Sequence, residues 1–445
     1  MTQESEKLLT NLYNAFDPSY PLQAGDPQYV DCQEARGDGN IIKELGIKIK
    51  RSKRMTCQLY AGHRGAGKST ELLRLKQYLE DLGYFVVYFA AEEQDIEPQD
   101  TEYTDILLAC TKHLLKALKN NGNSKPLFDW MKDRWNDLKE LGLTEISCET
   151  LSLELQIAHF AKLTANIKRE PKLREKIRDK INPHTTTLTD ALNKFIRDAK
   201  EKLPKGCSEI AVIADNLDRI IPSARKEGKQ NNLDEIFLDR SEQLKSLDCH
   251  VIYTIPISMV YSNRATELLD KYSSQQVLPM IMVKDRDGNI NETGLAKIKE
   301  LIENRVRKVN PNLSLETELF DDKETLNQLC LMSGGHVRNL LSMMQEAISK
   351  REELPITAEA GKRAITDTRD VYRRTVEQDE WQILAKVSQT QRIINDQQHR
   401  NLLFNRCILE YRYYDDEKEG ITWYDVHPLI RGIQEFKDSL AELEL

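Results

Sequence analysis

The stretch that decides the fold reads Gly62-His63-Arg64-Gly65-Ala66-Gly67-Lys68-Ser69-Thr70. It matches the pattern GxxxxGK[ST], in which a glycine-rich loop curls so that successive backbone N–H groups point at phosphate oxygens. A helix beginning near Lys68 would direct its positive end at the same anion. Lys68 is expected to neutralise the β and γ phosphates of a nucleotide, and the Ser69 hydroxyl to bind Mg²⁺. Residues 62–70 therefore predict a site for ATP and Mg²⁺.

The residues on either side of this loop have the context that the motif requires. A short apolar run, 57–62, precedes it, and leucines at helical spacing follow it, with Gly83 where a helix C-cap belongs. Further apolar runs alternate with helical segments, at 84–91, 210–214, 251–257 and 277–283. Buried strands alternating with helices predict an α/β fold with a doubly wound parallel sheet. We expect the run at 84–91 to be buried on both faces of that sheet.

The composition supports this fold and excludes several other classes. The 445 residues include only 19 Gly and 14 Pro, and 31% are charged, which disfavours an all-β sandwich or propeller. With 40% hydrophobic residues the chain can fill more than one core, so it is not disordered throughout. The eight Cys have no spacing suited to zinc and are expected to be reduced and buried. Without a membrane-spanning run or a signal-peptide pattern, we expect a cytoplasmic protein with no membrane partner.

The order of the patterns divides the chain into four parts. We expect an N-terminal helical arm at 1–24, a P-loop core at 25–311, a helical lid at 312–367 and a winged-helix-like domain at 368–445. The stretch 101–204 is far longer than one crossover needs and predicts a mainly helical insertion, with a Trp-bearing helix at 127–141 and a short alternating piece at 151–167. Two β-prone runs, 408–414 and 421–426, predict the hairpin of a winged helix.

An acid at the end of a buried strand should accompany a phosphate-binding loop. The apolar run 210–214 is followed by Asp215-Asn216-Leu217-Asp218-Arg219. Asp215 is expected where the strand emerges toward the phosphates, and it would hold Mg²⁺ through water. Asp218 is the candidate base for the attacking water; the alternative is a loop acid paired with Arg219.

These two motifs, together with Ser333-Gly334-Gly335-His336-Val337-Arg338, resemble the STAND and AAA+ branch of P-loop ATPases. The likeness is greatest to origin-recognition-type and STAND members, and it covers about residues 25 to 440 apart from the insertion. It implies a helical lid and a winged helix after the core. In ordinary AAA+ ATPases a Glu that polarises the attacking water follows the metal-holding Asp. Asn216 stands there in this chain, which implies slow hydrolysis.

The resemblance also implies roles for residues outside the two motifs. Arg338 in the lid helix would reach the γ-phosphate as sensor 2, unless it is a surface arginine. Thr254, on the strand expected between the two motif strands, would be sensor 1, although a threonine in a strand needs no functional reason. Arg264 and Arg305 are candidates, from location alone, for an arginine finger supplied to a neighbouring subunit. Residues 26–30 would contact the adenine base, or they form a linker turn with a packed tyrosine.

The charge distribution bears on nucleic-acid binding. The net charge is −8, yet two stretches, 48–54 and 168–180, are rich in Lys and Arg. Each is either a solvated face or a nucleic-acid contact. The turn of the expected hairpin, 415–419, reads Asp-Asp-Glu-Lys-Glu. Because this acidic tip would repel phosphates, DNA contact through the wing is disfavoured.

Two functions fit these observations. The first is a regulatory ATPase that switches conformation or assembly state with nucleotide and forms a homo-oligomer on ATP binding. The resemblance places such a switch in a prokaryotic defence or conflict system with a separate effector protein. The second is a DNA-binding AAA+ ATPase of replication-initiation or transposition type. A P-loop kinase or other transferase fits less well.

Overall fold

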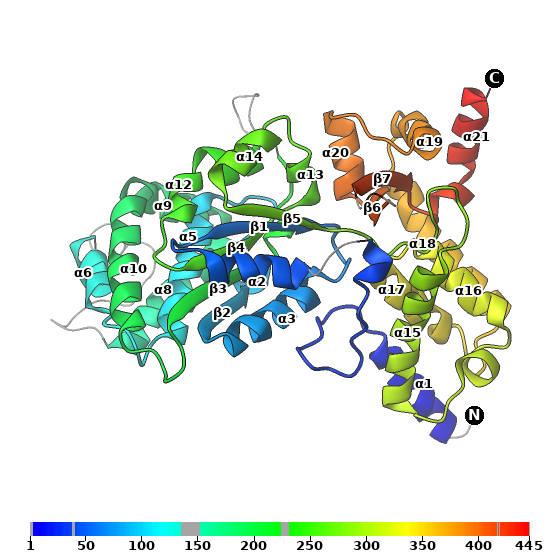
Figure 1. Ribbon diagram of the computed structural model, residues 1–445, viewed down its shortest axis with the longest axis horizontal. Helices are drawn as coiled ribbons and strands as arrows, with labels where there is room; N and C mark the ends of the chain where they lie inside the picture. Colours follow the sequence, from blue (N-terminus) through cyan, green and yellow to red (C-terminus); the bar gives the residue numbers. More distant parts are fainter. Residues whose placement is uncertain are drawn as a thin grey trace.

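The computed structural model describes residues 3–37, 41–134, 152–223, 231–415, 417 and 419–444. Five strands form the central sheet of the core (Figure 1): β1 (Cys57–Gly62), β2 (Tyr84–Ala90), β3 (Glu209–Asp215), β4 (His250–Thr254) and β5 (Ser274–Leu278). All of their pairings are parallel, in the order β2-β3-β4-β1-β5. This sheet confirms the predicted α/β class. Strand β4 lies between β1 and β3, where the strand with Thr254 was expected.

Two of the expected strands differ from the structure. Strand β2 lies at the edge of the sheet and is only half-buried over much of its length, so the expectation of burial on both faces is wrong. The run 277–283 leaves the sheet after Leu278. There Met280 N donates to Glu410 O (3.0 Å) and Met282 N donates to Ala35 O (2.8 Å). These residues are apolar because they pack between the core and the C-terminal domain, and not because they continue a strand.

Helices cover both faces of the sheet. Alternate residues of β1 enter different cores, as the two-residue period of a strand requires. Tyr60 packs in the core formed with α2 (Ile41–Arg51) and α3 (Lys68–Asp81), whereas Leu59 packs in the core on the opposite face. Short helices link the strands: α4 (Ala91–Gln94), α11 (Asn232–Asp234), α12 (Ser241–Lys245), α13 (Ile257–Val260) and α14 (Ala265–Lys271).

The insertion lies at the end of the molecule away from the C-terminal domain (Figure 1). Its helices are α5 (Tyr103–Ala117), α6 (Lys125–Asp133), α8 (Leu153–Arg169), α9 (Pro171–Ile181) and α10 (Thr185–Lys200). The piece at 151–167 is helical from Leu153 and not alternating, because Phe160, Leu163 and Ile167 form one buried helical face. Of the helix expected at 127–141, residues 135–141 lie outside the described residues, as does residue 151.

Two arginines of the basic stretch 168–180 serve the packing of this insertion, whereas Arg169, Lys172 and Lys176 are exposed. Arg174 and Arg178 on α9 are 5% and 4% exposed. Both donate to Asp100 at 2.8 Å, and the Arg178 Nε donates to Asp105 at 3.1 Å. Neither alternative for this stretch, a solvated face or a nucleic-acid contact, therefore describes these two arginines.

The lid consists of α15 (Glu292–Val309), α16 (Lys323–Met332), α17 (Val337–Ser349) and α18 (Ala358–Thr375). The N-terminal helix α1 (Gln3–Ala15) packs against α15 and α17. Helix α15 packs in turn against α16, although the expected boundary at 311 would assign it to the core. Helix α18 crosses the boundary expected at 367, so a continuous helix joins the lid to the last domain.

The last domain has the helix-helix-hairpin order of a winged helix. It contains α19 (Glu380–Thr390), α20 (Gln397–Phe404), β6 (Ile408–Tyr414), β7 (Gly420–Val426) and α21 (Gln434–Leu443). Strands β6 and β7 are antiparallel, with Ile408 opposite Val426, which confirms the predicted hairpin. Residues 416 and 418 of the acidic turn lie outside the described residues.

The composition predicts that the chain has no membrane-spanning helix and that its cysteines are reduced and buried. Within the described ranges, no helix has both the length and the apolar character needed to cross a bilayer. The described cysteines form no disulfide, and all but Cys207 are buried. Burial raises the pKa of Cys32 to about 11 and that of Cys110 to about 12, so both thiols stay neutral. Cys148 lies outside the described residues.

Candidate functional site

The glycine-rich loop joins β1 to α3 and lines a cavity of about 640 Å³. Gly65 has a φ of 88°, a backbone conformation that side chains with a Cβ rarely adopt. A Cβ at this position would lie 2.7 Å from both Arg338 Cβ and His336 Cε1. Glycine is therefore needed at position 65 both for the backbone and for the close approach of the lid.

Substitution of Gly65 by alanine should cost more than backbone strain alone. Gly206 is a matched control, because it has a φ of 95° and a Cβ there would meet no atom within 4 Å. We expect Gly206→Ala to lower the free energy of unfolding by about 1 kcal/mol, and Gly65→Ala by about 2 to 4 kcal/mol because the lid must also move. Urea denaturation measures both. Equal losses in the two variants would show that the lid does not press on the loop.

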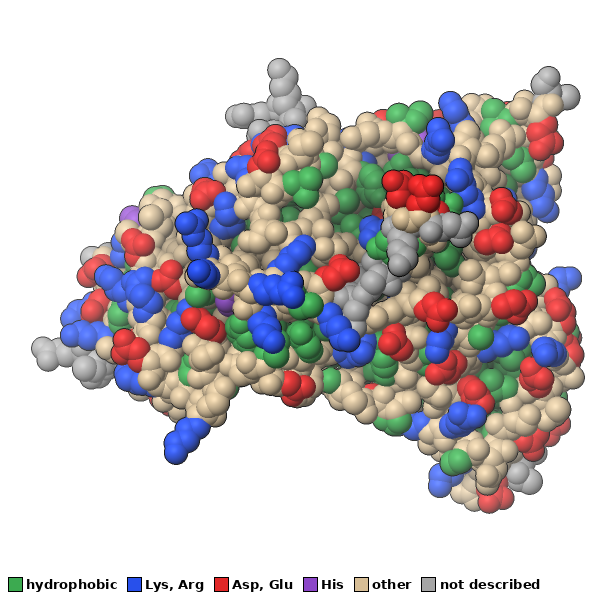
Figure 2. Space-filling model, viewed as in Figure 1, with side chains coloured by type: hydrophobic (Ala, Val, Ile, Leu, Met, Phe, Trp, Pro, Cys, Tyr) green, Lys and Arg blue, Asp and Glu red, His purple; other side chains and the backbone are tan. Residues whose placement is uncertain are grey.

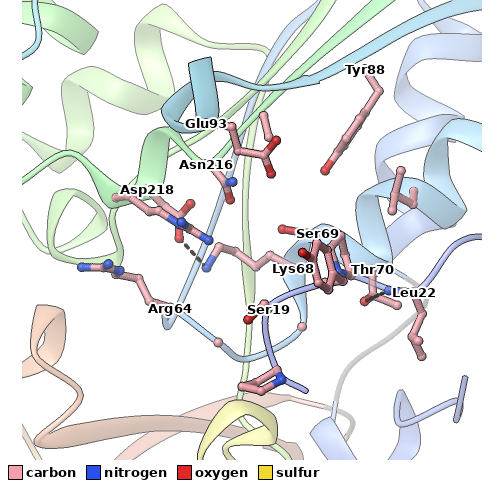
Figure 3. A pocket seen from close by; sticks show the side chains of 18 of the residues that line it. Ser19, Leu22, Arg64, Lys68, Ser69, Thr70, Tyr88, Glu93, Asn216 and Asp218 are labelled. Atoms are coloured by element: carbon pink, nitrogen blue, oxygen red, sulfur yellow. Dashed lines mark hydrogen bonds and ion pairs between the residues drawn. The ribbon is translucent and has the colours of Figure 1, made fainter. Parts of the chain in front are cut away.

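Lys68 lies in the centre of the loop. Its ammonium donates to Gly62 O and His63 O, both at 2.9 Å, and forms an ion pair with Asp218 Oδ2 at 2.9 Å (Figure 3). The Lys68 and Asp218 side chains are only 4% and 6% exposed. Asp218 lies in the short helical turn Leu217–Arg219 that follows β3. Asp218 is therefore already engaged in a buried ion pair, which opposes its first candidate role as the base that deprotonates water.

A second group of oxygen atoms lies beside the loop, at the end of β3. The fully buried Asp215 carboxylate accepts a hydrogen bond from the Tyr88 hydroxyl at 2.7 Å, and Ser69 also hydrogen-bonds to it. Burial and then the nearby Asp218 charge raise the pKa of Asp215. The described residues contain no group of three or more His, Cys, Asp or Glu side chains that would hold a metal alone. One hydroxyl and one carboxylate suit Mg²⁺, which takes its other oxygens from phosphates and water.

Three consecutive loop residues are hydrogen-bonded to the lid and the wing. The backbone N–H of Glu410 in β6 donates to His63 Nε2 at 2.9 Å. His336 Nε2 is hydrogen-bonded to Arg64 O at 2.6 Å, and Arg338 N donates to Gly65 O at 3.1 Å. Burial, followed by the Lys68 charge, lowers the pKa of His63 to about 3, which keeps its imidazole neutral as an acceptor. The loop is thus the meeting point of the three domains.

The cavity is strongly cationic. The Lys and Arg residues that line it outnumber the carboxylates. The carboxylates are Glu93, Asp95 and Asp218, and the cations are Arg64, Lys68, Lys76, Lys116, Arg219, Arg305 and Arg338. Burial lowers the pKa of Arg338, and the charges of Arg219, Arg406 and Arg64 lower it further. Among the described residues, no acid or hydrogen-bond acceptor pairs with the guanidinium of Arg64 or Arg338. This arrangement favours a ligand with several negative charges.

The structure brings most of the predicted site residues together. Much of the loop, Asp218 and Arg338 line the cavity, and Asp215 lies directly behind Ser69. Thr254 does not line the cavity. It is fully buried, and its hydroxyl accepts a hydrogen bond from Leu217 N at 2.9 Å. The Thr254 hydroxyl therefore supports the turn that carries Asp218, and its role as sensor 1 stays a prediction.

The two candidate arginine fingers lie in different surroundings. Arg264 pairs with Asp239 and Glu267 and does not line the cavity. Arg305 is 5% exposed, donates to Leu301 O at 2.9 Å and lines the cavity of its own chain. Its burial lowers the pKa of Arg305 to about 10. Arg305 thus faces the cavity of its own chain, and its role as an arginine finger stays a prediction.

The segment 26–30 also lies outside the cavity wall. The Tyr29 hydroxyl donates to Glu71 Oε1 at 3.2 Å, and the Arg74 guanidinium lies 4.0 Å from the centre of its ring. This arrangement fits the linker turn with a packed tyrosine. Residues 18–23 line the cavity instead, and Leu22 N donates to Thr70 Oγ1 at 3.2 Å.

Sequence reasoning missed further residues of the cavity wall. Tyr88 lies in β2 and Glu93 in α4, which follows β2 directly, and His113 and Lys116 come from the insertion helix α5. The position of Tyr88 and Glu93 near the carboxyl end of β2 is a sequence signal for these two residues, because every parallel strand of such a sheet ends at this edge. No sequence signal identifies His113 or Lys116, whose position depends on how the insertion packs.

Neither a protein-family model nor a curated protein sequence matches this chain. Several solved structures match nearly all of it. A Walker-type ATPase of Pyrococcus abyssi is 14% identical, with a TM-score of 0.43 over 96% of this chain and 99% of that one. The Orc1 protein of Aeropyrum pernix, solved in complex with DNA, is 12% identical, with a TM-score of 0.38 over 97% and 96%. Cdc6p from Pyrobaculum aerophilum is 11% identical, with a TM-score of 0.40 over 97% and 98%. Because these three TM-scores are below 0.5, the assignment of the fold rests on the sheet order and the loop geometry.

Proposed function

We propose that the protein is an ATP-binding, slowly hydrolysing regulatory ATPase, in which nucleotide changes the packing of the lid and the wing on the core. The observation that carries this proposal is the set of hydrogen bonds to three consecutive loop residues. His63, Arg64 and Gly65 are bonded to Glu410, His336 and Arg338, respectively. If the loop changes conformation when it binds phosphates, its hydrogen bonds to the lid and to the wing would change together.

The cationic cavity supports a preference for a triphosphate. Beyond the effect of burial, the charges of Arg219, Arg406 and Arg64 lower the pKa of Arg338, so these cations repel its guanidinium, which is unfavourable. A third phosphate would offset this repulsion, whereas a diphosphate would offset less of it. A ligand shifts a conformational equilibrium only by its difference in affinity for the two states. ATP and ADP would therefore favour different arrangements of the lid.

The turn after β3 supports slow hydrolysis, because it offers no free carboxylate to the attacking water. Asn216 presents an amide where a carboxylate would be the usual proton acceptor, and Asp218 is paired with Lys68 at 2.9 Å. A long-lived ATP state suits a switch better than a motor. In this proposal the ATP-bound form assembles into a homo-oligomer and acts on a separate effector protein, within a prokaryotic defence or conflict system.

A second candidate is a DNA-binding ATPase, and one observation favours it. Side chains at the end of α2 and in the following turn are exposed, and Lys and Arg gather over α2 in Figure 2; the basic residues are Lys48, Lys50, Arg51, Lys53 and Arg54. This stretch could contact phosphates. The winged helix itself is less available, because α20 packs against α13 of the core. Asp415, Glu417 and Glu419 also keep the described part of the hairpin turn acidic.

Mass photometry of the full chain distinguishes the two candidates. The measurement compares the protein alone, with ADP and with ATP, and repeats each condition with duplex DNA and with RNA. Assembly with ATP and no nucleic acid supports the switch. Assembly that requires DNA supports the alternative. A chain that binds ATP and keeps the same mass in all conditions would contradict assembly by either route.

The variant Arg338→Ala tests the discrimination between triphosphate and diphosphate. A hydrogen bond to a charged group contributes about 1.5 to 3 kcal/mol, so we expect the ratio of ATP to ADP affinity to fall about tenfold or more. Isothermal titration calorimetry measures both affinities. Arg363→Ala is the control, since Arg363 is 63% exposed on the lid and pairs with Glu359. An unchanged ratio in Arg338→Ala would contradict contact with the third phosphate.

A further inference from the structure

The carboxylates that line the cavity differ in whether they are already paired. Asp218 pairs with Lys68 at 2.9 Å. Asp95 pairs with Lys112 and accepts from His113 Nε2 at 2.9 Å. Glu93 has no ion pair or hydrogen bond with any other described residue. Within the described part of the wall, Glu93 is therefore the carboxylate that is available to accept a proton.

Glu93 is placed beside the end of β3. It lies in α4, which follows β2 directly, and the last residue of β2, Ala90, is in register with Asp215. Figure 3 shows the Glu93 side chain between Asn216 and Tyr88, in the same part of the cavity as Ser69. The Glu93 charge also raises the pKa of Tyr88, so the two side chains are near one another. Glu93 thus faces the region where the outer phosphate of a nucleotide on Lys68 and Ser69 would lie.

Asn216 complements this placement. Its backbone has a φ of 63°, the left-handed conformation, which a non-glycine residue adopts at a cost. The turn holds the amide side chain at the cavity wall. An amide cannot take up a proton at ordinary pH, but its oxygen and nitrogen can hold a water molecule by hydrogen bonds.

We propose that Glu93 is the general base for ATP hydrolysis and that Asn216 orients the water that it deprotonates. This inference rests on the proposed function. A Glu93 oxygen takes a proton from the water as the water oxygen attacks the γ phosphorus. The bond between the γ phosphorus and the bridging oxygen breaks, and its electron pair stays on ADP. The products are ADP, inorganic phosphate and the proton that Glu93 later releases.

Asp218 is a less suitable base in the same geometry. A proton on Asp218 would remove the charge that balances Lys68 inside a site where the two side chains are 6% and 4% exposed. Leaving one member of a buried ion pair without its partner is strongly unfavourable. Glu93 can accept a proton without breaking any contact with the described residues.

The test compares Glu93→Gln with two matched amide variants, Asp218→Asn and Glu97→Gln. Glu97 lies four residues beyond Glu93 and does not line the cavity. Two measurements are made on each full-length protein: ATP affinity by calorimetry, and conversion of bound ATP to ADP in a single turnover. We expect Glu93→Gln to bind ATP within about threefold of the parent and to hydrolyse it at least about 100-fold more slowly. Glu97→Gln should match the parent, and Glu93→Gln should retain intact ATP through gel filtration.

Several outcomes would overturn the assignment of Glu93. Hydrolysis by Glu93→Gln at the parental rate would do so, as would a parent that binds ATP and forms no ADP. Loss of ATP binding in Glu93→Gln would place this residue in binding and not in proton transfer. A parent that fails to bind ATP is a different result, because it contradicts the proposed function itself.

Discussion

Replacement of Lys68 by alanine is expected to lower ATP affinity by more than about 100-fold. The ammonium lies in the centre of the loop, where the hydrogen bonds that it donates to Gly62 O and His63 O orient it. Charge-assisted contacts to two phosphates contribute about 1.5 to 3 kcal/mol each, and alanine makes neither. Isothermal titration calorimetry with ATP and Mg²⁺ measures the loss.

The same substitution leaves the Asp218 carboxylate buried without its partner, so the variant is also expected to lose stability. The double variant Lys68→Ala/Asp218→Asn removes both charges and separates the two effects. It should regain much of the stability without regaining ATP affinity. Lys50→Ala is the control, because it removes one cation from an exposed position on α2 of the P-loop domain. Parental ATP affinity in the double variant would show that the loop is not the nucleotide site.

Replacement of Arg178 by alanine is expected to destabilise the protein by about 3 to 5 kcal/mol, the cost of breaking a buried ion pair. The side chains of Arg178 and Asp105 are 5% and 0% exposed. Burial raises the pKa of Asp105 even though the Arg178 charge opposes this effect. Without Arg178, the carboxylate would be buried without a cation. Chemical denaturation of the parent and the variant measures the loss.

The pH dependence of this loss has a defined sign. A carboxyl whose pKa is raised in the folded state binds more protons when folded, so its unfavourable effect grows as the pH rises. The deficit of Arg178→Ala should therefore shrink between about pH 7 and about pH 5. In Arg178→Leu/Asp105→Asn the loss of stability should be smaller, because the oxygen of the new amide can still accept from Glu102 N, as Asp105 does at 2.9 Å. This loss should also be nearly independent of pH, because an amide does not titrate in this range. Arg169→Ala, at an exposed position, should change stability by less than about 0.5 kcal/mol.

The sequence was sufficient to predict those parts of the fold that depend on local chemistry. The glycine-rich loop, the strand before it and the acid-ending strand β3 have residue types that few other structures require. The hairpin β6-β7 is similarly marked by two β-prone runs around a polar turn. In these segments the residues that form the structure are adjacent in the chain, so their sequence pattern is sufficient to predict the structure.

Features set by long-range packing could not be predicted in this way. The run 280–283 has the same apolar character as a buried strand, yet it is buried against the C-terminal domain. Arg178 has the same appearance in the sequence as a surface arginine, because its partners Asp100 and Asp105 lie more than 70 residues away in the chain. The availability of Glu93 could be recognised only when the partners of Asp95 and Asp218 were known.

The hydrogen bonds between the loop and the wing place two distant segments under a shared evolutionary constraint. His63 accepts from Glu410 N, and Met280 N donates to Glu410 O, so one residue of β6 contacts both the loop and the chain after β5. A change in the path of β6 would have to be matched by a change beside the loop. Divergence in the wing is therefore limited along this strand.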